Sequence, residues 1–257
     1  NSLSEFTLGG GDNINSVLSG FARNPYNTAY ATGGSSGGTA SSIAANFATV
    51  GIGTDTGGSI RNPAAHNAVV GFRPTVGLVS RNGMTPNCFH RDTIGPLGRT
   101  VADVAITLAA IAGTDPDDPA TQACDGDMPA RLTNLRRDAL HGVRLGVLRQ
   151  VFPAEATDRR ILACFDGNLA ELKRAGAVIV DDFRVPEIEG LARSAPTPAR
   201  RKAEFSNWFA RHPGIPYPSM EAIARSKLAH PLHHALIEAI ASAGPVESDP
   251  DTREADR

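Results

Sequence analysis

Three serines lie among glycines at two places in the first third of the sequence. Ser35 and Ser36 belong to residues 33–38, which read GGSSGG, and Ser59 ends the glycine-rich turn 56–59. Glycine lets a backbone approach a ligand closely, and consecutive N–H groups at such a turn can hold a developing oxyanion. A serine hydroxyl placed there lies beside the charge that it would create by attacking a carbonyl carbon. The pattern therefore suits acyl transfer through a serine nucleophile.

Other interpretations of the two clusters are less demanding. Ser59 can be an ordinary helix N-cap after a glycine turn, and residues 33–38 can be a flexible Gly/Ser segment. A phosphate-binding loop of the type G-x-x-x-x-G-K-[ST] fails, because no lysine precedes Lys173. A dinucleotide fingerprint, or the G-x-S-x-G turn that residues 33–37 match literally, needs an apolar strand before it. Residues 24–28 do not read as such a strand.

Alternating helices and strands must position these clusters. Apolar spacing predicts helices over 37–49 and 60–67 and strands over 49–53, 69–72 and 77–80. Residues 99–112 form an amphipathic helix pattern, with Thr100 as N-cap and Asp103 three residues later. We expect loops through residues 1–30, apart from a short helix or strand at 4–8, and a surface loop over 115–130.

The second half of the chain has a different order of elements. A strand over 143–148, a helix over 159–175 ended by Gly176, and a strand over 177–180 together predict a βαβ unit. Residues 199–243 read as helices with a break around 212–214. Phe205, Trp208 and Phe209 fit the core face of one of these helices, with contact to a substrate as the alternative.

The composition limits the class of protein. Hydrophobic residues make up 41% and charged residues 20% of the 257 residues, which suits a soluble globular protein, for which the cytoplasm is the favoured compartment. The formal net charge is −2 without a basic stripe, so nucleic acid is not an expected partner. Residues 101–113 are the best membrane candidate, but they are too few and include Asp103, so no membrane partner is expected.

The cysteines and histidines give no metal site. Cys88, Cys124 and Cys164 are widely spaced, so we expect free buried thiols, with a Cys124–Cys164 bridge as the alternative. The sequence HPLHH at 230–234 suggests a metal site at first sight. However, a third ligand is not evident, and Pro231 breaks the helical spacing that zinc sites often use, so we expect solvated histidines at a helix start.

Several longer motifs then occur in a fixed order. They are GGSSGG at 33–38, GIGTD at 51–55, GGSIRNPAA at 57–65, VGFRPTVG at 70–77, DTIGP at 92–96 and RTVAD at 99–103. This ordered set resembles the amidase signature family, and the resemblance is weaker beyond Thr114. It implies an α/β fold with a mixed, twisted sheet flanked by helices on both faces, of which residues 1–114 are the signature core and residues 115–257 the second half. We expect residues 247–257 to be disordered.

The resemblance also implies an activity and its residues. Family members hydrolyse or transfer carboxamides with a Ser–cis-Ser–Lys triad, and they use no metal or cofactor. Ser59 matches the acyl-forming nucleophile. Ser35 matches the serine that relays protons, and in the family this serine follows a cis peptide bond, here the one after Gly34. The remaining matches are the oxyanion hole, formed by Thr56, Gly57, Gly58 and Ser59, and the supporting residues Ser36, Asp55 and Arg61.

The triad lysine has no match in this chain. In the family it precedes the segment that matches residues 1–6, whereas Lys173, Lys202 and Lys227 lie far downstream. His66 and His90 are weak substitutes, since a helix containing both Ser59 and His66 would separate them by about 10 Å along its axis. The chain thus resembles the middle of an amidase, incomplete at both ends. A missing segment or a separate chain would supply the lysine. The alternative is an inactive or clipped relative that acts as a binding module or subunit.

One departure from the family bears on the substrate. The tRNA-dependent amidotransferase subunits usually carry Asp-Gln where this chain has Asp92 and Thr93. That departure favours a free-standing amidase, and residues 92–96 and 205–219 resemble most the bacterial peptide amidases. The expected substrate is therefore a small-molecule or peptide amide.

Overall fold

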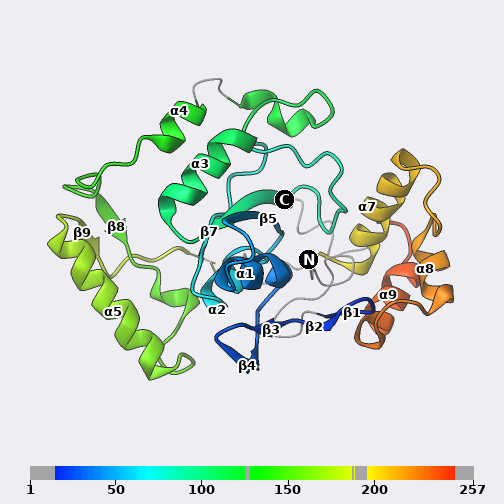
Figure 1. Ribbon diagram of the computed structural model, residues 1–257, viewed down its shortest axis with the longest axis horizontal. Coiled ribbons are helices and arrows are strands. Elements are labelled where there is room, and N and C mark those ends of the chain that lie inside the picture. Colours follow the sequence, from blue (N-terminus) through cyan, green and yellow to red (C-terminus); the bar gives the residue numbers. More distant parts are fainter. Residues whose placement is uncertain (1–14, 125–127, 187, 189–195, 247–257) are drawn as a thin grey trace. The chain divides into compact units, whose positions relative to one another are not determined.

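The computed structural model describes residues 15–124, 128–186, 188 and 196–246, which divide into two compact units (Figure 1). Among the described residues, the first unit comprises 15–133 and 196–246, and the second comprises 134–188. The predicted element at 4–8 and the predicted disordered end at 247–257 lie outside the described residues.

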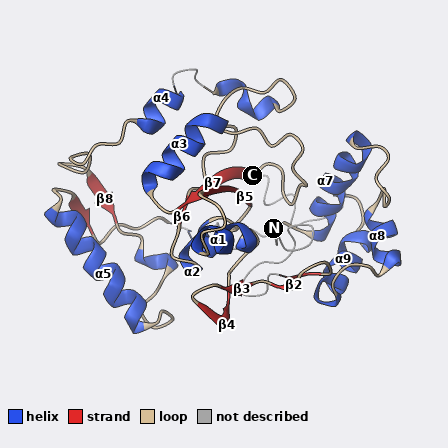
Figure 2. Ribbon diagram, in the orientation of Figure 1, coloured by secondary structure: helices blue, strands red, loops and turns tan. Residues whose placement is uncertain are grey.

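A three-stranded antiparallel sheet belongs to the first unit (Figure 2). β7 (Thr93–Gly98) lies between β5 (Val50–Asp55) and β6 (Val70–Gly71). In the register of β5 and β7, Gly53 is opposite Gly95 and Asp55 is opposite Thr93. The predicted strands at 49–53 and 69–72 are confirmed in substance, whereas β7 was not predicted. The strand predicted at 77–80 is wrong, because that segment forms a turn with a single bridge at Val79.

Two short helices cover this sheet and carry the serine clusters. α1 (Gly37–Ala44) and α2 (Arg61–His66) pack with β7 through an apolar cluster. Its buried members are Ala40, Ile43, Ile60, Ala64 and Leu97. Figure 1 shows these helices on one side of the sheet and α3 (Val101–Ile111) on the other. The helix predicted over 37–49 is too long, because Asn46 adopts a left-handed φ of 63° just after it.

Glycines on β5 let α1 approach the strand closely. A Cβ built at Gly51 would lie 2.5 Å from the methyl of Thr39, and one at Gly53 would lie 2.7 Å from the Ser36 hydroxyl. Both distances are too short for a real side chain. The two glycines are therefore required for the first serine cluster to lie against the strand that leads to the second cluster.

The remaining helices of the first unit were largely predicted. α3 begins with the expected capping box, in which Thr100 and Asp103 exchange hydrogen bonds of 2.9 and 3.1 Å. α7 (Pro198–Arg211), α8 (Met220–Ser226) and α9 (Pro231–Ser242) bury one cluster. Phe205 and Phe209 are in that cluster, and Trp208 packs against it, so the prediction of a core face is confirmed.

Two segments predicted as irregular contain more structure than expected. The region before residue 31 forms two short antiparallel pairs, of β1 (Asn15–Ser16) with β2 (Gly20–Phe21), and of β3 (Arg23–Asn24) with β4 (Asn27–Ala31). The predicted surface loop at 115–130 includes a 3₁₀ helix, Pro119–Ala123, and the start of α4 (Met128–Thr133). Asp118 in that region is 1% exposed, so the prediction of a surface loop is wrong there.

The second unit contains the predicted βαβ arrangement. β8 (Arg144–Gly146) pairs in parallel with β9 (Val178–Val180), and α5 (Arg159–Arg174) connects them after a 3₁₀ turn, Arg149–Val151. Gly176 follows the end of α5 with a φ of 96°, as expected for a helix-ending glycine. Helices combine with both antiparallel and parallel pairing, so the α/β class with mixed strand directions is confirmed. No helix in the described ranges is both long and apolar enough to cross a membrane.

Candidate active site

The two serine clusters meet through the main chain. The N–H of Ser36 donates to the carbonyl oxygen of Ser59 at 3.0 Å, and the N–H of Gly34 donates to the side chain of Asn62 at 2.9 Å. The peptide bond between Gly34 and Ser35 is cis, as the family resemblance implies. These two hydrogen bonds thus join the segment just before α1 to the start of α2 and the residue pair that precedes it.

The two neighbouring serines of the first cluster have different environments. The Ser36 hydroxyl donates to the carbonyl of Thr54 and accepts from its N–H, both at 3.1 Å, so it fastens the cluster to β5. Ser35 is 0% exposed, and within the part of the chain that the structure describes its Oγ has no hydrogen-bond partner. A buried hydroxyl without a hydrogen-bond partner lowers the stability of the fold, so it needs an explanation. One explanation is a hydrogen bond to a group outside the described residues.

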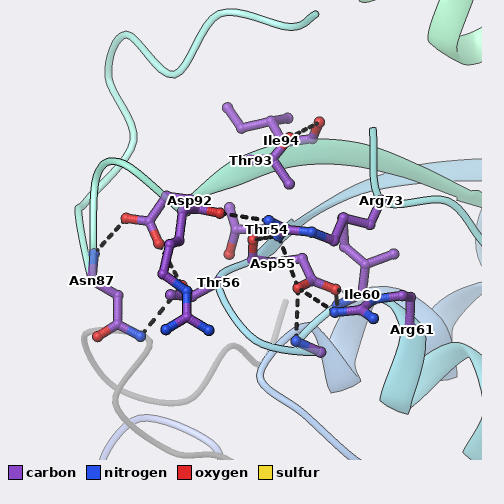
Figure 3. A network of polar contacts seen from close by, with 12 residues as sticks. Thr54, Asp55, Thr56, Ile60, Arg61, Arg73, Asn87, Asp92, Thr93 and Ile94 are labelled. Carbon is purple, nitrogen blue, oxygen red and sulfur yellow. Dashed lines mark hydrogen bonds and ion pairs between the residues drawn. The ribbon is translucent and has the colours of Figure 1, made fainter. Parts of the chain in front are cut away.

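The buried carboxylate of Asp55 holds the turn that carries Ser59. Asp55 ends β5, and its two oxygens accept from the N–H groups of Gly58 at 2.7 Å and Ile60 at 3.1 Å (Figure 3). Arg61 contacts the same carboxylate with two nitrogens, at 3.2 and 3.3 Å, and Arg73 contacts it at 3.1 Å. The fold therefore brings Asp55 and Arg61 into contact, and their ion pair spans the turn at residues 56–60.

These contacts also set the charge of Asp55. Burial by itself raises the pKa of this carboxyl, but the hydrogen bond from Arg61, those from the main chain of Ile60 and Gly58, and the positive charge of Arg61 hold the pKa below its ordinary value. Asp55 is therefore ionised near neutral pH, and its charge keeps the turn in one conformation.

The four main-chain groups of the matched oxyanion turn are not equivalent. The N–H of Gly58 already donates to Asp55, and Gly58 has a φ of 136°, which favours glycine. The N–H groups of Gly57 and Ser59 are engaged with no other atom of the described residues. Gly57 is exposed and Ser59 is partly exposed, so a ligand can reach this turn.

The loop before β7, which contains residues 87–92, supports the turn from outside. The carboxylate of Asp92 accepts from the Thr56 hydroxyl at 2.5 Å and from the N–H groups of Asn87 and Cys88 at 2.8 and 2.9 Å (Figure 3). Arg73 also donates to the carbonyl of Arg91 at 2.8 Å. The signal was present in the motifs around residues 70–77 and 92–96, but neither motif indicates which side chains meet.

Cys88 and His90 are close together without forming an activated pair. The Cys88 sulfur lies 3.3 Å from Nδ1 of His90. Burial, followed by the negative charge of Asp92, raises the pKa of the Cys88 thiol to about 11, so the thiol stays protonated at neutral pH. All three cysteines are free, and only Cys88 is buried, so the expectation of buried thiols is wrong for Cys124 and Cys164.

The two lysines of the first unit are held by groups other than the serines. Lys202 is bound to the carbonyl oxygens of Ala241 and Ala243 and to Glu221, and Lys227 is paired with Glu238. Lys173 belongs to the second unit. That the three lysines take no part in a triad stays a prediction. His66 ends α2 and is exposed.

The histidines at 230–234 do not collect metal ligands. His230 caps α9 by accepting from the N–H of Leu232, and His234 contacts the carbonyl of Ala229 at 2.7 Å. His233 is only 5% exposed, so the prediction of solvated histidines is wrong for this residue. Within the described ranges, no group of three or more His, Cys, Asp or Glu residues could hold a metal ion.

Comparisons with known proteins show the family of this chain. The family model named Amidase matches residues 2–234. A glutamyl-tRNA(Gln) amidotransferase subunit from Pelobacter propionicus is 41% identical over 211 residues, which cover 82% of this chain and 42% of that protein. The peptide amidase structure from Stenotrophomonas maltophilia is 36% identical with a TM-score of 0.81, covering 98% of this chain and 52% of that one.

A further structure gives the same result at lower similarity. The corresponding amidotransferase subunit from Thermotoga maritima is 29% identical with a TM-score of 0.66, and the match covers 93% of this chain and 50% of that one. The chain thus spans about half the length of the relatives that it matches. Because the family model covers most of the chain and a peptide amidase structure matches its fold, this chain belongs to the amidase signature family.

Proposed function

We propose that the protein carrying this chain hydrolyses carboxamides through an acyl-enzyme formed on Ser59. The observation that carries the proposal is the buried Ser35 hydroxyl without a described partner, next to a main-chain hydrogen bond that joins Ser36 to Ser59. A proton relay needs such a hydroxyl, because it must accept a proton from the nucleophile and pass it on. A hydroxyl already bound on both sides, as in Ser36, would be less suited.

The proposed reaction has two steps. In the first, Ser59 Oγ attacks the amide carbonyl, Ser35 takes part in moving the proton to the leaving nitrogen, and ammonia or an amine departs. In the second, water attacks the ester carbonyl, the carboxylate is released and Ser59 recovers its proton. The N–H groups of Gly57 and Ser59 are the available donors for the oxyanion. In this proposal, Gly58 and Thr56 shape the turn through their bonds to Asp55 and Asp92.

The base of the proposed triad comes from outside the described residues. A lysine supplied by another segment or another chain would complete the buried position beside Ser35. The alternative is a binding module or subunit that keeps the fold without catalysis. The likeness to an amidotransferase subunit makes a partner chain a reasonable proposal.

For the substrate, we propose C-terminally amidated peptides. The likeness to peptide amidases supports this choice, as does Thr93 at the position where tRNA-dependent subunits usually carry glutamine. The second candidate, glutamine as an ammonia donor, is favoured by the identity to the amidotransferase subunits.

Ammonia release separates these candidates. The whole protein is incubated with an amidated dipeptide, with the corresponding free acid and with glutamine, and Ser59→Ala is the control. The proposal predicts Ser59-dependent release of ammonia from the amidated peptide. Release from glutamine alone would favour the second candidate, and no Ser59-dependent release from any amide would overturn the hydrolase.

A further inference from the structure

A buried ion pair lies outside the serine site. Arg81 and Asp118 are 5% and 1% exposed, and their side chains meet through two hydrogen bonds, Nη2 to Oδ1 at 2.6 Å and Nε to Oδ2 at 2.8 Å. The main-chain N–H of Arg81 donates to the same carboxylate at 2.9 Å. Such a paired, bidentate arrangement fixes the orientation of the guanidinium as well as its charge.

Arg81 uses the rest of its guanidinium to hold a loop. Nη1 donates to the carbonyl of Phe89, and the guanidinium carbon lies 4.0 Å from the centre of the Phe89 ring. The segment after Phe89 is a tight turn, because the N–H groups of Arg91 and Asp92 both donate to the carbonyl of Cys88 at 2.8 Å. Arg81 is therefore one of the groups that hold this loop, at its Phe89 end.

The end of the loop is connected to the candidate oxyanion turn in two ways, one direct and one through Arg73. Asp92 accepts from the Thr56 hydroxyl at 2.5 Å. Arg73 joins the carbonyl of Arg91, at 2.8 Å, to the carboxylate of Asp55, at 3.1 Å. Both contacts act on residues 55–56, immediately before the N–H groups that are proposed to hold the oxyanion.

We propose that Arg81 and Asp118 are positioning residues for the turn that carries Ser59, acting through the loop 87–92 and the Asp92–Thr56 hydrogen bond. This inference rests on the proposed amidase function. The pair makes no hydrogen bond to the serines, so its effect is on the alignment of the oxyanion donors. Misalignment of such donors lowers the rate of the chemical step more than it weakens substrate binding.

The test is a double-mutant cycle on the whole protein. Asp118→Asn removes the anion that orients Arg81, and Arg81→Lys removes the guanidinium that bonds the Phe89 carbonyl. For each variant we expect about a tenfold loss in kcat with KM changed less than about threefold. In a Thr56→Val background, where the Asp92–Thr56 link is absent and only the link through Arg73 remains, the same substitutions should cost less. Asp103→Asn, which removes a carboxylate from the cap of α3 far from this loop, is the control for a general loss of stability.

Each outcome of the cycle decides the inference. Equal losses in both backgrounds, or a loss in Asp118→Asn no greater than in Asp103→Asn, would overturn it. If Asp118→Asn does not fold, Arg81→Lys gives the same comparison with the positive charge retained. A parent protein without Ser59-dependent hydrolysis would instead refute the proposed function, so the two failures are distinguishable.

Discussion

The main-chain N–H of Ser36 donates to the carbonyl oxygen of Ser59 at 3.0 Å, so the residue after the cis-linked Ser35 is fixed to the proposed nucleophile. This hydrogen bond connects the start of α1 with the turn before α2. A backbone hydrogen bond therefore helps to set the relative position of the two candidate serines, together with the side chain of Asn62, which accepts from the Gly34 N–H.

Ser35 and Ser36 should respond in opposite ways to loss of their hydroxyls. The Ser36 hydroxyl has two partners on Thr54, and we expect Ser36→Ala to lower the free energy of unfolding by roughly 1–2 kcal/mol. The Ser35 hydroxyl has no described partner, so Ser35→Ala should leave that free energy unchanged or raise it, while kcat falls by at least about a hundredfold. Denaturant unfolding and steady-state kinetics check the two effects. A marked loss of stability in Ser35→Ala, with activity kept, would contradict the relay.

Asp55→Asn should disturb both stability and activity. The carboxylate serves two main-chain N–H groups and two arginines, and an amide cannot accept from all of them. We expect a loss of about 3 kcal/mol in unfolding free energy, because two guanidinium groups lose their anion. Activity should fall as the turn at 56–60 loosens. The matched control is Asp166→Asn, whose exposed ion pair with Arg149 should matter little.

Because of the Asp118 carboxyl, the free energy of unfolding should decrease as the solution becomes acidic. Hydrogen bonds from the Arg81 side chain, opposed by burial, lower the pKa of Asp118 from 3.8 to about 2. A carboxyl whose pKa is lower in the folded than in the unfolded protein stabilises the fold at any pH above the unfolded pKa. This stabilisation of about 2 kcal/mol is lost as the pH falls through the folded pKa. The stability difference between the parent and Asp118→Asn should thus shrink between pH 5 and pH 2, as measured by denaturant unfolding. A difference that stays constant over this range would contradict the ion pair.

Two glycines should show opposite effects of an added methyl group. A Cβ at Gly95 would overlap the carbonyl of Phe72 and lie 2.7 Å from Cδ of Pro74, so Gly95→Ala should destabilise the fold by about 1–3 kcal/mol. Gly167 lies in α5 with nothing within 4 Å of the built Cβ, so Gly167→Ala should stabilise by about 1 kcal/mol. Thermal unfolding of the two variants gives the comparison. Destabilisation by Gly167→Ala would argue against the helix.

Gly95 also shows why β7 could not be predicted from the sequence. No strand is predicted over residues 93–98, and Gly95, Pro96 and Gly98 are residues that normally interrupt strands. In the structure, Gly95 is needed for the close approach of Phe72, and the carbonyl of Pro96 accepts from the Phe72 N–H at 3.0 Å. These requirements come from a neighbouring strand and cannot be read from local pattern.

Local signals were sufficient elsewhere. The capping box of α3 and the βαβ order of the second unit depend on residues near one another in the sequence, and both were predicted. By contrast, the Asp118 carboxylate was placed in a surface loop because its partner, Arg81, is distant in the chain. For the candidate site, motifs indicated Ser35, Ser59 and Asp55, but the support from Asp92 depends on a contact that only folding creates.

The central claim is that Ser59 is the acyl-forming nucleophile. The most direct measurement is intact-mass analysis of the whole protein after treatment with a fluorophosphonate, which phosphonylates activated serines. The account predicts one adduct, mapped to Ser59 by peptide mass analysis, that is absent in Ser59→Ala and forms more slowly in Ser35→Ala. An adduct that persists in Ser59→Ala would contradict the account.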